Sequence, residues 1–232
     1  MGERSLCIGG LIIFGVIFLI LFLLAGKSRR LVLVSALGAA PFGLLGFVFY
    51  SVWYPGRITN GMVGIEDFLF CFFSGGISLA LISLFLDFSV FGFSLSFKFL
   101  RIFFSGIIGA GFMLLLYFIH IRNYLNSYLS MAFMILLLIG LQKGLWKVFV
   151  VGSSALLVIY SAAMMIDFIL WPDLISLWKK ENLSGIFLSG VPFEELIWAF
   201  LFGGTWPVIF LYAMGPKGAN YQWKSITYKN KA

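Results

Sequence analysis

The sequence predicts an all-α integral membrane protein with seven transmembrane helices, built as two three-helix repeats joined by a linker helix. The first observation is composition: the chain is 62% hydrophobic and 11% charged, with a mean hydropathy of +1.06. A soluble domain is about half apolar and about a quarter charged. The second observation is that the apolar stretches are long and continuous, which favours helices over the short alternating strands of a membrane β-barrel. The third is an acidic motif that occurs twice.

Seven apolar stretches of membrane-spanning length follow one another along the chain. We expect the helices at about 6–26, 31–53, 63–86, 101–120, 128–147, 149–171 and 186–213. The first stretch ends in Lys27-Ser28-Arg29-Arg30 rather than in a small-residue cleavage site, so we interpret it as a retained helix. The prediction is one membrane domain, 1–232, with repeat 1 at about 6–86, the linker helix at about 101–120, repeat 2 at about 128–213 and a cytoplasmic tail at 217–232.

The basic residues predict the orientation of the chain. Seven spans place the two termini on opposite sides of the membrane. Eleven of the sixteen Lys and Arg residues fall in the loops and tail on the C-terminal side, and five fall on the other side. Because basic residues collect on the cytoplasmic side, we expect a multi-pass cell-membrane protein with its N-terminus outside and its C-terminus in the cytoplasm. This asymmetry accounts for the net charge of +7, so no nucleic acid partner is expected.

The acidic motif places two adjacent carboxylic acids at the start of an apolar span in each half. Its copies, 64–76 and 192–204, align without a gap at an offset of 128 residues. The pairs are Glu66 with Asp67, and Glu194 with Glu195. At the helical rise, Glu66 would lie about 6 Å inside its span and Glu194 about 12 Å. Carboxylic acids inside a membrane are costly and are read as functional by default, although the helix dipole also favours acids at a helix N-terminus.

The repeat predicts how the two pairs are arranged. Because the halves have the same orientation, both motifs should enter their helices from the outer side and face one another across a pseudo-symmetric interface. Adjacent residues project about 100° apart on a helix, so one acid of each pair can face the bundle centre. There, one carboxyl group could donate a proton and another could accept it. The glycine pairs that follow, Gly75-Gly76 and Gly203-Gly204, would let another helix approach closely.

These residues carry a resemblance to a known family. The sequence Gly190-Val191-Pro192-Phe193-Glu194-Glu195, preceded by Trp178, Gly185 and Asp167, resembles the membrane-embedded lycopene cyclase domain. That family closes the end rings of carotenoids, and occurs as two three-helix subunits or as a fusion with one extra helix between them. The resemblance implies that the two acidic pairs here match the family's two pairs, with Gly64 where the family usually has proline. It also implies that Asp167 matches an acid on the penultimate helix of a unit.

The activity that this resemblance implies is an isomerisation. An acid protonates the terminal double bond of a polyene, a nearby double bond attacks the cation, and loss of a proton completes the ring. Such a site needs a dry pocket, and aromatic faces can stabilise the cation. The implied catalytic residues are Glu66, Asp67, Glu194, Glu195 and Asp167, and the implied substrate-binding residues are Phe68, Phe70, Phe72, Phe73, Trp198 and Phe200. The expected partners are a lipophilic polyene or isoprenoid substrate and membrane lipid, with no cofactor and no metal.

Other classes fit parts of the sequence. An intramembrane protease with a Glu-Glu motif needs histidines after the motif, and the sequence has none there. A membrane prenyltransferase needs aspartate-rich repeats for magnesium and diphosphate, and these are missing. A non-enzymatic small transporter or membrane assembly protein with repeated intramembrane acids stays open as the alternative. His120, the one histidine, is interpreted as an interfacial residue, and Cys7 and Cys71 as small core residues.

Overall fold

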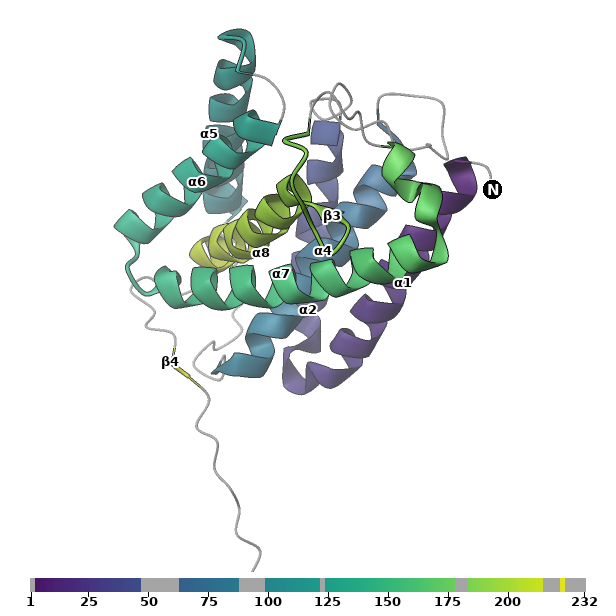
Figure 1. The fold of residues 1–232 in the computed structure, drawn as a ribbon. Helices are drawn as coiled ribbons and strands as arrows, with labels where there is room; N and C mark the ends of the chain where they lie inside the picture. The colour runs from purple at the N-terminus through teal and green to yellow at the C-terminus, as the bar shows by residue number, and fades with distance from the viewer. Residues whose placement is uncertain are drawn as a thin grey trace, which may run out of the picture.

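The computed structural model describes residues 3–46, 63–87, 99–121, 124–177, 183–214 and 222–223. These residues are predominantly helical, and Figure 1 shows α4 and α8 in the middle of the assembly. The α-helices are α1 (Glu3–Leu24), α2 (Arg29–Ala39), α4 (Ile65–Phe85), α5 (Phe99–Phe118), α6 (Tyr124–Leu141), α7 (Leu145–Leu170) and α8 (Phe193–Met214). The shorter elements are the 3₁₀ helices η1 (Gly26–Ser28), η2 (Ala40–Leu45) and η3 (Pro172–Leu177), and the strands β1 (Leu86–Asp87), β2 (Phe187–Leu188), β3 (Val191–Pro192) and β4 (Gln222–Trp223).

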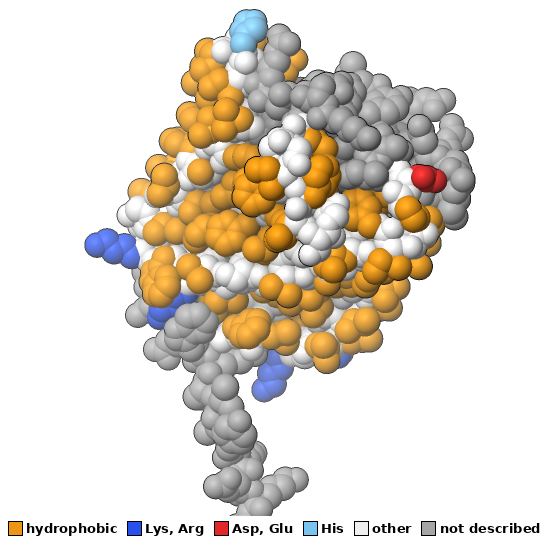
Figure 2. All heavy atoms as spheres, in the orientation of Figure 1, with side chains coloured by type: hydrophobic (Ala, Val, Ile, Leu, Met, Phe, Trp, Pro, Cys, Tyr) orange, Lys and Arg blue, Asp and Glu red, His pale blue; other side chains and the backbone are white. Residues whose placement is uncertain are grey.

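Five helical segments in the described part of the chain are long and apolar enough to cross a membrane. They are Cys7–Leu24, Gly26–Leu45, Ile65–Phe85, Leu145–Leu170 and Phe193–Met214, accompanied by the shorter apolar helices Ser105–Phe118 and Leu125–Leu141. Hydrophobic side chains cover most of the face shown in Figure 2, and basic side chains lie at its left and lower edges. A helical chain suited to a membrane is therefore confirmed, whereas the seven-span, two-repeat arrangement stays a prediction.

The second predicted span, 31–53, is only partly α-helical. The helix α2 stops at Ala39 and the chain continues as η2. Pro41 explains the change, because a proline has no N–H to donate to the preceding turn and its ring crowds that turn. Residues 47–53 lie outside the described residues, as do Trp178 and most of the tail predicted at 217–232.

The fifth and sixth predicted spans are separated at a different place from the one expected. The prediction put the break between residues 147 and 149, but α6 ends at Leu141 and α7 begins at Leu145. The polar residues Gln142 and Lys143 and the poor helix former Gly144 interrupt the apolar run here. The boundary therefore follows these three residues rather than Lys147.

The seventh predicted span begins too early. The segment 186–192 was expected to be helical, but β2 and β3 pair there as an antiparallel hairpin and α8 begins at Phe193. Ser189 and Gly190 connect the strands with φ angles of 52° and 84°. Two consecutive positive φ angles are what a tight type I′ hairpin turn requires, so the apolar run is broken by turn geometry and not by polarity.

This hairpin changes the depth of the second acidic pair. The prediction that Glu194 lies about 12 Å inside its helix is wrong, because Glu194 is the second residue of α8. Glu66 is likewise the second residue of α4. The two motif helices begin at Ile65 and Phe193, at the same offset of 128 residues that separates the motifs. Both pairs thus occupy the first turn of equivalent helices.

The two motif helices form the centre of the protein. The buried share of the apolar segment is 67% for α8 and 56% for α4, compared with 17% for α1. The helix α4 packs mainly on α2 and then on α1, while α8 packs mainly on α7 and then on α6. A helix surrounded by protein must be apolar on every side, which explains why these two sequences show no polar face.

The close helix approach predicted at the glycine pairs is confirmed. A Cβ atom on Gly75 would lie 2.3 Å from the Cβ of Ala39 in α2, and one on Gly203 would lie 2.6 Å from the carbonyl oxygen of Gly152 in α7. A real side chain cannot occupy such space, so these helix pairs need glycine at the contact. Close packing at a glycine therefore occurs both between α4 and α2 and between α8 and α7.

Candidate functional site

The second acidic pair is buried at the start of α8. Glu194 and Glu195 are each 8% exposed. The Tyr160 hydroxyl in α7 donates a hydrogen bond of 2.7 Å to Oε2 of Glu195. The backbone N–H of Ser184 donates to Oε1 of Glu194, and the Tyr128 hydroxyl donates to the Glu194 carbonyl oxygen at 2.7 Å. Within the described residues, Oε2 of Glu194 has no hydrogen-bond partner. The pair is therefore fixed by three separate segments, with one carboxyl oxygen unengaged.

Local sequence explains why Glu195 can reach Tyr160. Pro192 directly precedes α8, and Glu195 is the third residue of that helix. An acid at this third position often accepts a hydrogen bond from the N–H of the residue before the helix. Proline has no N–H, so the carboxyl group of Glu195 cannot be used in this way and is left for a tertiary partner.

The first acidic pair is arranged differently. Glu66 is 4% exposed, and Asp67 is half-buried. The N–H of Gly64 donates to Oδ2 of Asp67 at 2.8 Å, and the Asp67 N–H donates to the Gly64 carbonyl at 3.1 Å. A Cβ on Gly46 of the neighbouring segment would lie 3.0 Å from Cγ of Asp67. Asp67 thus caps its own helix, which is the structural role that the dipole argument allows for acids at this position.

Asp167 is buried in α7, on the side that faces α1. It is 2% exposed, and within the described residues its Oδ1 atom has no hydrogen-bond partner. Its Oδ2 atom lies 3.7 Å from where a Cβ on Gly10 would be, and the ring of Trp171 lies against Gly9. Two glycines of α1 therefore make room for this acid and this indole. Tyr160 precedes Asp167 by two helical turns, which places both on one face of α7.

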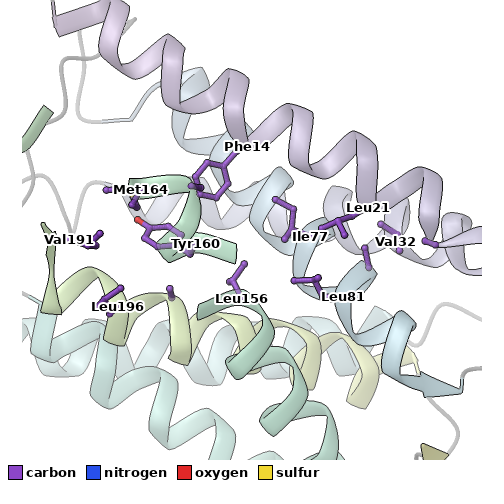
Figure 3. Packing of buried hydrophobic residues seen from close by; sticks show 14 of the residues in the cluster. Phe14, Leu21, Val32, Ile77, Leu81, Leu156, Tyr160, Met164, Val191 and Leu196 are labelled. Atoms are coloured by element: carbon purple, nitrogen blue, oxygen red, sulfur yellow. The ribbon is translucent and has the colours of Figure 1, made fainter. Parts of the chain in front are cut away.

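Four aromatic side chains from four helices form a closed circuit beside the second pair. Phe14 of α1 contacts Phe70 of α4 and Tyr160 of α7, with ring centroids 5.4 and 5.6 Å apart. Trp198 of α8 completes the circuit, 5.3 Å from Phe70 and 5.7 Å from Tyr160. Figure 3 shows Phe14 and Tyr160 facing one another between their helices. We call these four residues the aromatic circuit. Because Tyr160 also bonds Glu195, this circuit connects a buried acid to both halves of the chain.

An apolar cavity of about 140 Å³ lies on the other side of Trp198. Its walls come from α5, α6 and α8, from Cys71 of α4, and from the end of α2 and η2. None of the five predicted acids lines this cavity. Neither acidic pair therefore borders this space, and Trp198 is the residue shared by the cavity and the aromatic circuit.

The predicted substrate-binding residues lie in different places. Trp198 lines the cavity, and Phe70 contacts Trp198. Phe72 and Phe73 pack against Phe18 of α1, with centroids 5.3 and 5.7 Å away. The two others lie elsewhere: Phe200 packs against Phe149, and Phe68 is half-buried beside Gly43. The structure thus brings the rings of Phe70 and Trp198 into contact, and Phe73 packs against the same buried cluster as these two.

Sequence reasoning missed several residues of this region. Tyr160 and Tyr128 bond the second pair, and Phe14 completes the aromatic circuit. A signal for Tyr160 was present, because it stands seven residues before Asp167 and therefore shares its helix face. No local pattern points to Tyr128 or Phe14, since their partners lie on other helices.

The fold and the site together define a helical protein of membrane type that buries carboxylic acids beside aromatic rings. In the described ranges, no group of three or more His, Cys, Asp and Glu is arranged to hold a metal ion. Residues 122–213 match the family model described as lycopene cyclase. This stretch contains α6, α7 and α8 with Asp167, Glu194 and Glu195.

The match confirms that this chain distantly resembles the lycopene cyclase family. At the level of the family, it supports a carotenoid cyclase-like enzyme that acts on a lipophilic carotenoid and is associated with membranes. No curated protein and no solved structure matches the chain.

Proposed function

We propose that this protein is a lycopene cyclase-like isomerase that closes an end ring of a carotenoid or related polyene by acid-initiated cyclisation inside the membrane. The observation that carries the proposal is the buried second acidic pair, which contacts an aromatic circuit within the region of the family match. A carboxylic acid supplies the proton for such a reaction, and aromatic faces stabilise the cation that follows.

Glu194 is suited to deliver the starting proton. Its Oε1 atom accepts the N–H of Ser184, and its buried Oε2 atom has no partner among the described residues. A proton carried on Oε2 therefore meets no competing hydrogen-bond acceptor in the part of the chain that the structure describes. In the reaction, the electron pair of the terminal double bond takes this proton, a C–H bond forms, and the adjacent carbon becomes cationic.

Glu195 is suited to take a proton away at the end of the reaction. The Tyr160 hydroxyl donates to its Oε2 atom, which supports a carboxylate and fixes its orientation. A neighbouring double bond attacks the cation and closes the ring, and loss of a proton from an adjacent carbon to Glu195 restores a double bond. Transfer of that proton back to Glu194 resets the site. No oxidant is consumed, so the product is an isomer of the substrate.

Exclusion of water is part of the proposed mechanism. Water would trap the cation as an alcohol, so the site must be dry. The aromatic circuit is backed by a buried apolar cluster that includes Leu156, Ala163, Leu196 and Ala199. The aromatic rings offer faces to the cation, and the aliphatic side chains behind them help to exclude water.

The proposal includes two related halves within one membrane domain, 1–232. Three features support the repeat: the equivalent starts of α4 and α8, the matching packing order in each half, and the glycine contacts that hold α4 on α2 and α8 on α7. The excess of basic residues on one side supports an outer N-terminus and a cytoplasmic C-terminus. Reporter fusions to the two termini, compared on each side of the membrane, test this orientation.

The proposed function is tested by expressing the chain in bacteria that accumulate lycopene and separating the extracted pigments by chromatography. The wild-type chain is expected to produce cyclised pigment, and Glu194→Gln is expected to produce almost none. Glu181→Gln, outside both motifs, is the matched control for an acid-to-amide change. Unchanged acyclic pigment from a well-expressed wild-type chain, also with other acyclic polyenes as substrates, would contradict the proposal.

A further inference from the structure

The apolar cavity next to Trp198 has a fixed relation to both acidic pairs. Trp198 stands four residues after Glu194 on α8, and Cys71 stands four residues after Asp67 on α4. Residues four apart share a helix face, and side chains lean toward the helix N-terminus. Glu194 and Asp67 therefore lie about one turn nearer the N-termini of their helices than these two wall residues, as does Glu195, which stands three residues before Trp198.

A second connection comes from α6. Ser127 lines the cavity, and the next residue, Tyr128, donates its hydroxyl to the carbonyl oxygen of Glu194. The segment that forms the cavity wall thus also fixes the first turn of α8. An occupant of the cavity would be held at a defined position relative to Glu194.

The cavity presents carbon and sulfur atoms rather than polar groups. The Ser130 hydroxyl donates to the Asn126 carbonyl at 2.8 Å, and the Thr205 hydroxyl donates to the Leu201 carbonyl at 2.7 Å. The indole N–H of Trp206 donates to Ser35 at 2.9 Å. Because these wall donors are already used within the protein, the space suits a hydrocarbon and offers an ion or sugar no free donor from them.

Three methionines give this wall a polarisable surface. Met113 of α5 and Met131 and Met134 of α6 line the cavity, opposite the indole rings of α8. Methionine side chains adapt their shape to a ligand, and sulfur makes favourable contacts with π systems. A polyene end, which is apolar and rich in π electrons, matches both properties.

The volume limits what can bind. An apolar cavity of roughly 150 Å³ is large enough to hold benzene, and this one measures about 140 Å³. It can therefore accept a group of about the size of one six-membered ring, and a long polyene must leave most of its length outside.

We propose that this cavity is the binding site for one end group of the polyene substrate, held one helical turn inward of Glu194. This inference rests on the proposed function and adds the place where the hydrocarbon binds. Specificity for the end group then comes from α5, α6 and α8, while the acids act from the first turns of α4 and α8.

The test fills the cavity and measures pigment retention separately from catalysis. Full-length protein carrying Glu195→Gln, so that substrate is not consumed, is purified in detergent from a lycopene-accumulating host. Retained pigment per protein is measured by absorbance. Ala110→Phe on the cavity wall of α5 is expected to lower retention about tenfold, because the filled space removes the contacts that hold the end group. Gly111→Leu is the matched control, since nothing lies within 4 Å of Gly111 on the same helix.

A second filling variant, Met131→Trp, approaches the same space from α6 and guards against a folding defect in the first. Thermal melting of each purified variant reports its fold. Loss of retention in both filled variants with retention in Gly111→Leu supports the site. Unchanged retention in folded Ala110→Phe and Met131→Trp overturns it, as does a parent protein that retains no pigment.

The outcomes also separate this inference from the proposed function. For this comparison Ala110→Phe and Met131→Trp are also made in the chain with Glu195 intact. Cyclised pigment from the wild-type chain and from both of these variants would support the cyclase activity and would show that the cavity is not its binding site. Retention that depends on the cavity, with no cyclised pigment from the wild-type chain, would instead show that the protein binds a polyene and would contradict the cyclase activity.

Discussion

The first turns of α4 and α8 carry the same acidic motif but use their third residue in opposite ways. In α4, Asp67 accepts the N–H of Gly64 and caps its own helix. In α8, the equivalent Glu195 accepts the hydroxyl of Tyr160, which stands 35 residues earlier in the chain. The residue before the helix decides the difference, because Gly64 has an N–H to donate and Pro192 does not. The backbone N–H before the helix thus decides whether the third-position acid caps its own helix, as Asp67 does, or bonds a residue of another helix, as Glu195 does.

This comparison extends to the surroundings of each pair. Around the second pair, Tyr128 and Ser184 add hydrogen bonds, and Asp167 lies two turns along α7 from Tyr160. Around the first pair, η2 packs closely against the backbone of Asp67. The family match covers only the half that contains the second pair. The first turns of α4 and α8 share the acidic motif, and the proposed chemistry is concentrated at α8.

The largest expected effect comes from neutralising the second pair. Glu195→Gln should lower the rate of ring closure by about 100-fold or more, which is the usual contribution of a positioned acid or base. Asp67→Asn should lower the rate far less, because that side chain is occupied with capping. Initial rates of pigment cyclisation in isolated membranes, at matched protein levels, provide the comparison. Equal losses in the two variants would break the distinction between the pairs.

A smaller loss is expected from removing the hydroxyl that orients Glu195. Tyr160→Phe keeps the ring of the aromatic circuit and deletes the hydrogen bond to Oε2. Bonds to a charged group contribute about 1.5–3 kcal/mol, so the rate should fall by roughly 10-fold to 100-fold. Pigment retention in detergent should stay at the wild-type level, since the ring is unchanged. Tyr117→Phe, at an exposed position on α5, is the control. A Tyr160→Phe rate equal to that of the wild type would show that Glu195 needs no such partner.

The proline can be tested directly by giving α8 the missing donor. Pro192→Gly and Pro192→Ala both restore an N–H before the helix, so in both variants Glu195 can cap α8 instead of meeting Tyr160. A few-fold fall in rate is expected, because one local bond competes with one tertiary bond of similar strength. The two variants should behave alike. A loss confined to Pro192→Gly would point to backbone flexibility rather than to the added donor.

The smallest effect should come from the cap of α4. Asp67→Ala removes the acceptor for the Gly64 N–H, and loss of a helix cap costs about 1 kcal/mol. For a chain of this size, the melting temperature should fall by roughly 2–4 °C. Differential scanning fluorimetry of the protein in detergent measures the change, with Ser161→Ala on α7 as a control of comparable size. A melting temperature identical to that of the wild type would mean that Asp67 is not a cap in solution.

Much of this architecture could be predicted from the sequence. The helical membrane class and the glycine contacts depend on local apolar runs and small residues, which can be recognised directly in the sequence. One boundary error, between α6 and α7, lies at the polar residues Gln142 and Lys143. The others fell where apolar runs continue through a change of structure. Ile186, Phe187 and Leu188 look like the start of a span, and only the Ser189-Gly190 turn indicates the hairpin. The η2 segment similarly continues an apolar run past Pro41.

The sequence by itself determined that two adjacent pairs of acids stand in apolar stretches of membrane-spanning length. It did so because burying carboxyl groups in an apolar chain is costly, which makes them conspicuous. Only the tertiary structure decided which acid meets Tyr160, which one caps a helix, and where the apolar cavity lies. Those outcomes depend on side chains from α1, α6 and α7 that approach from distant parts of the chain. Their contacts depend on how the helices pack together, and the spacing of residues along the sequence does not show this directly.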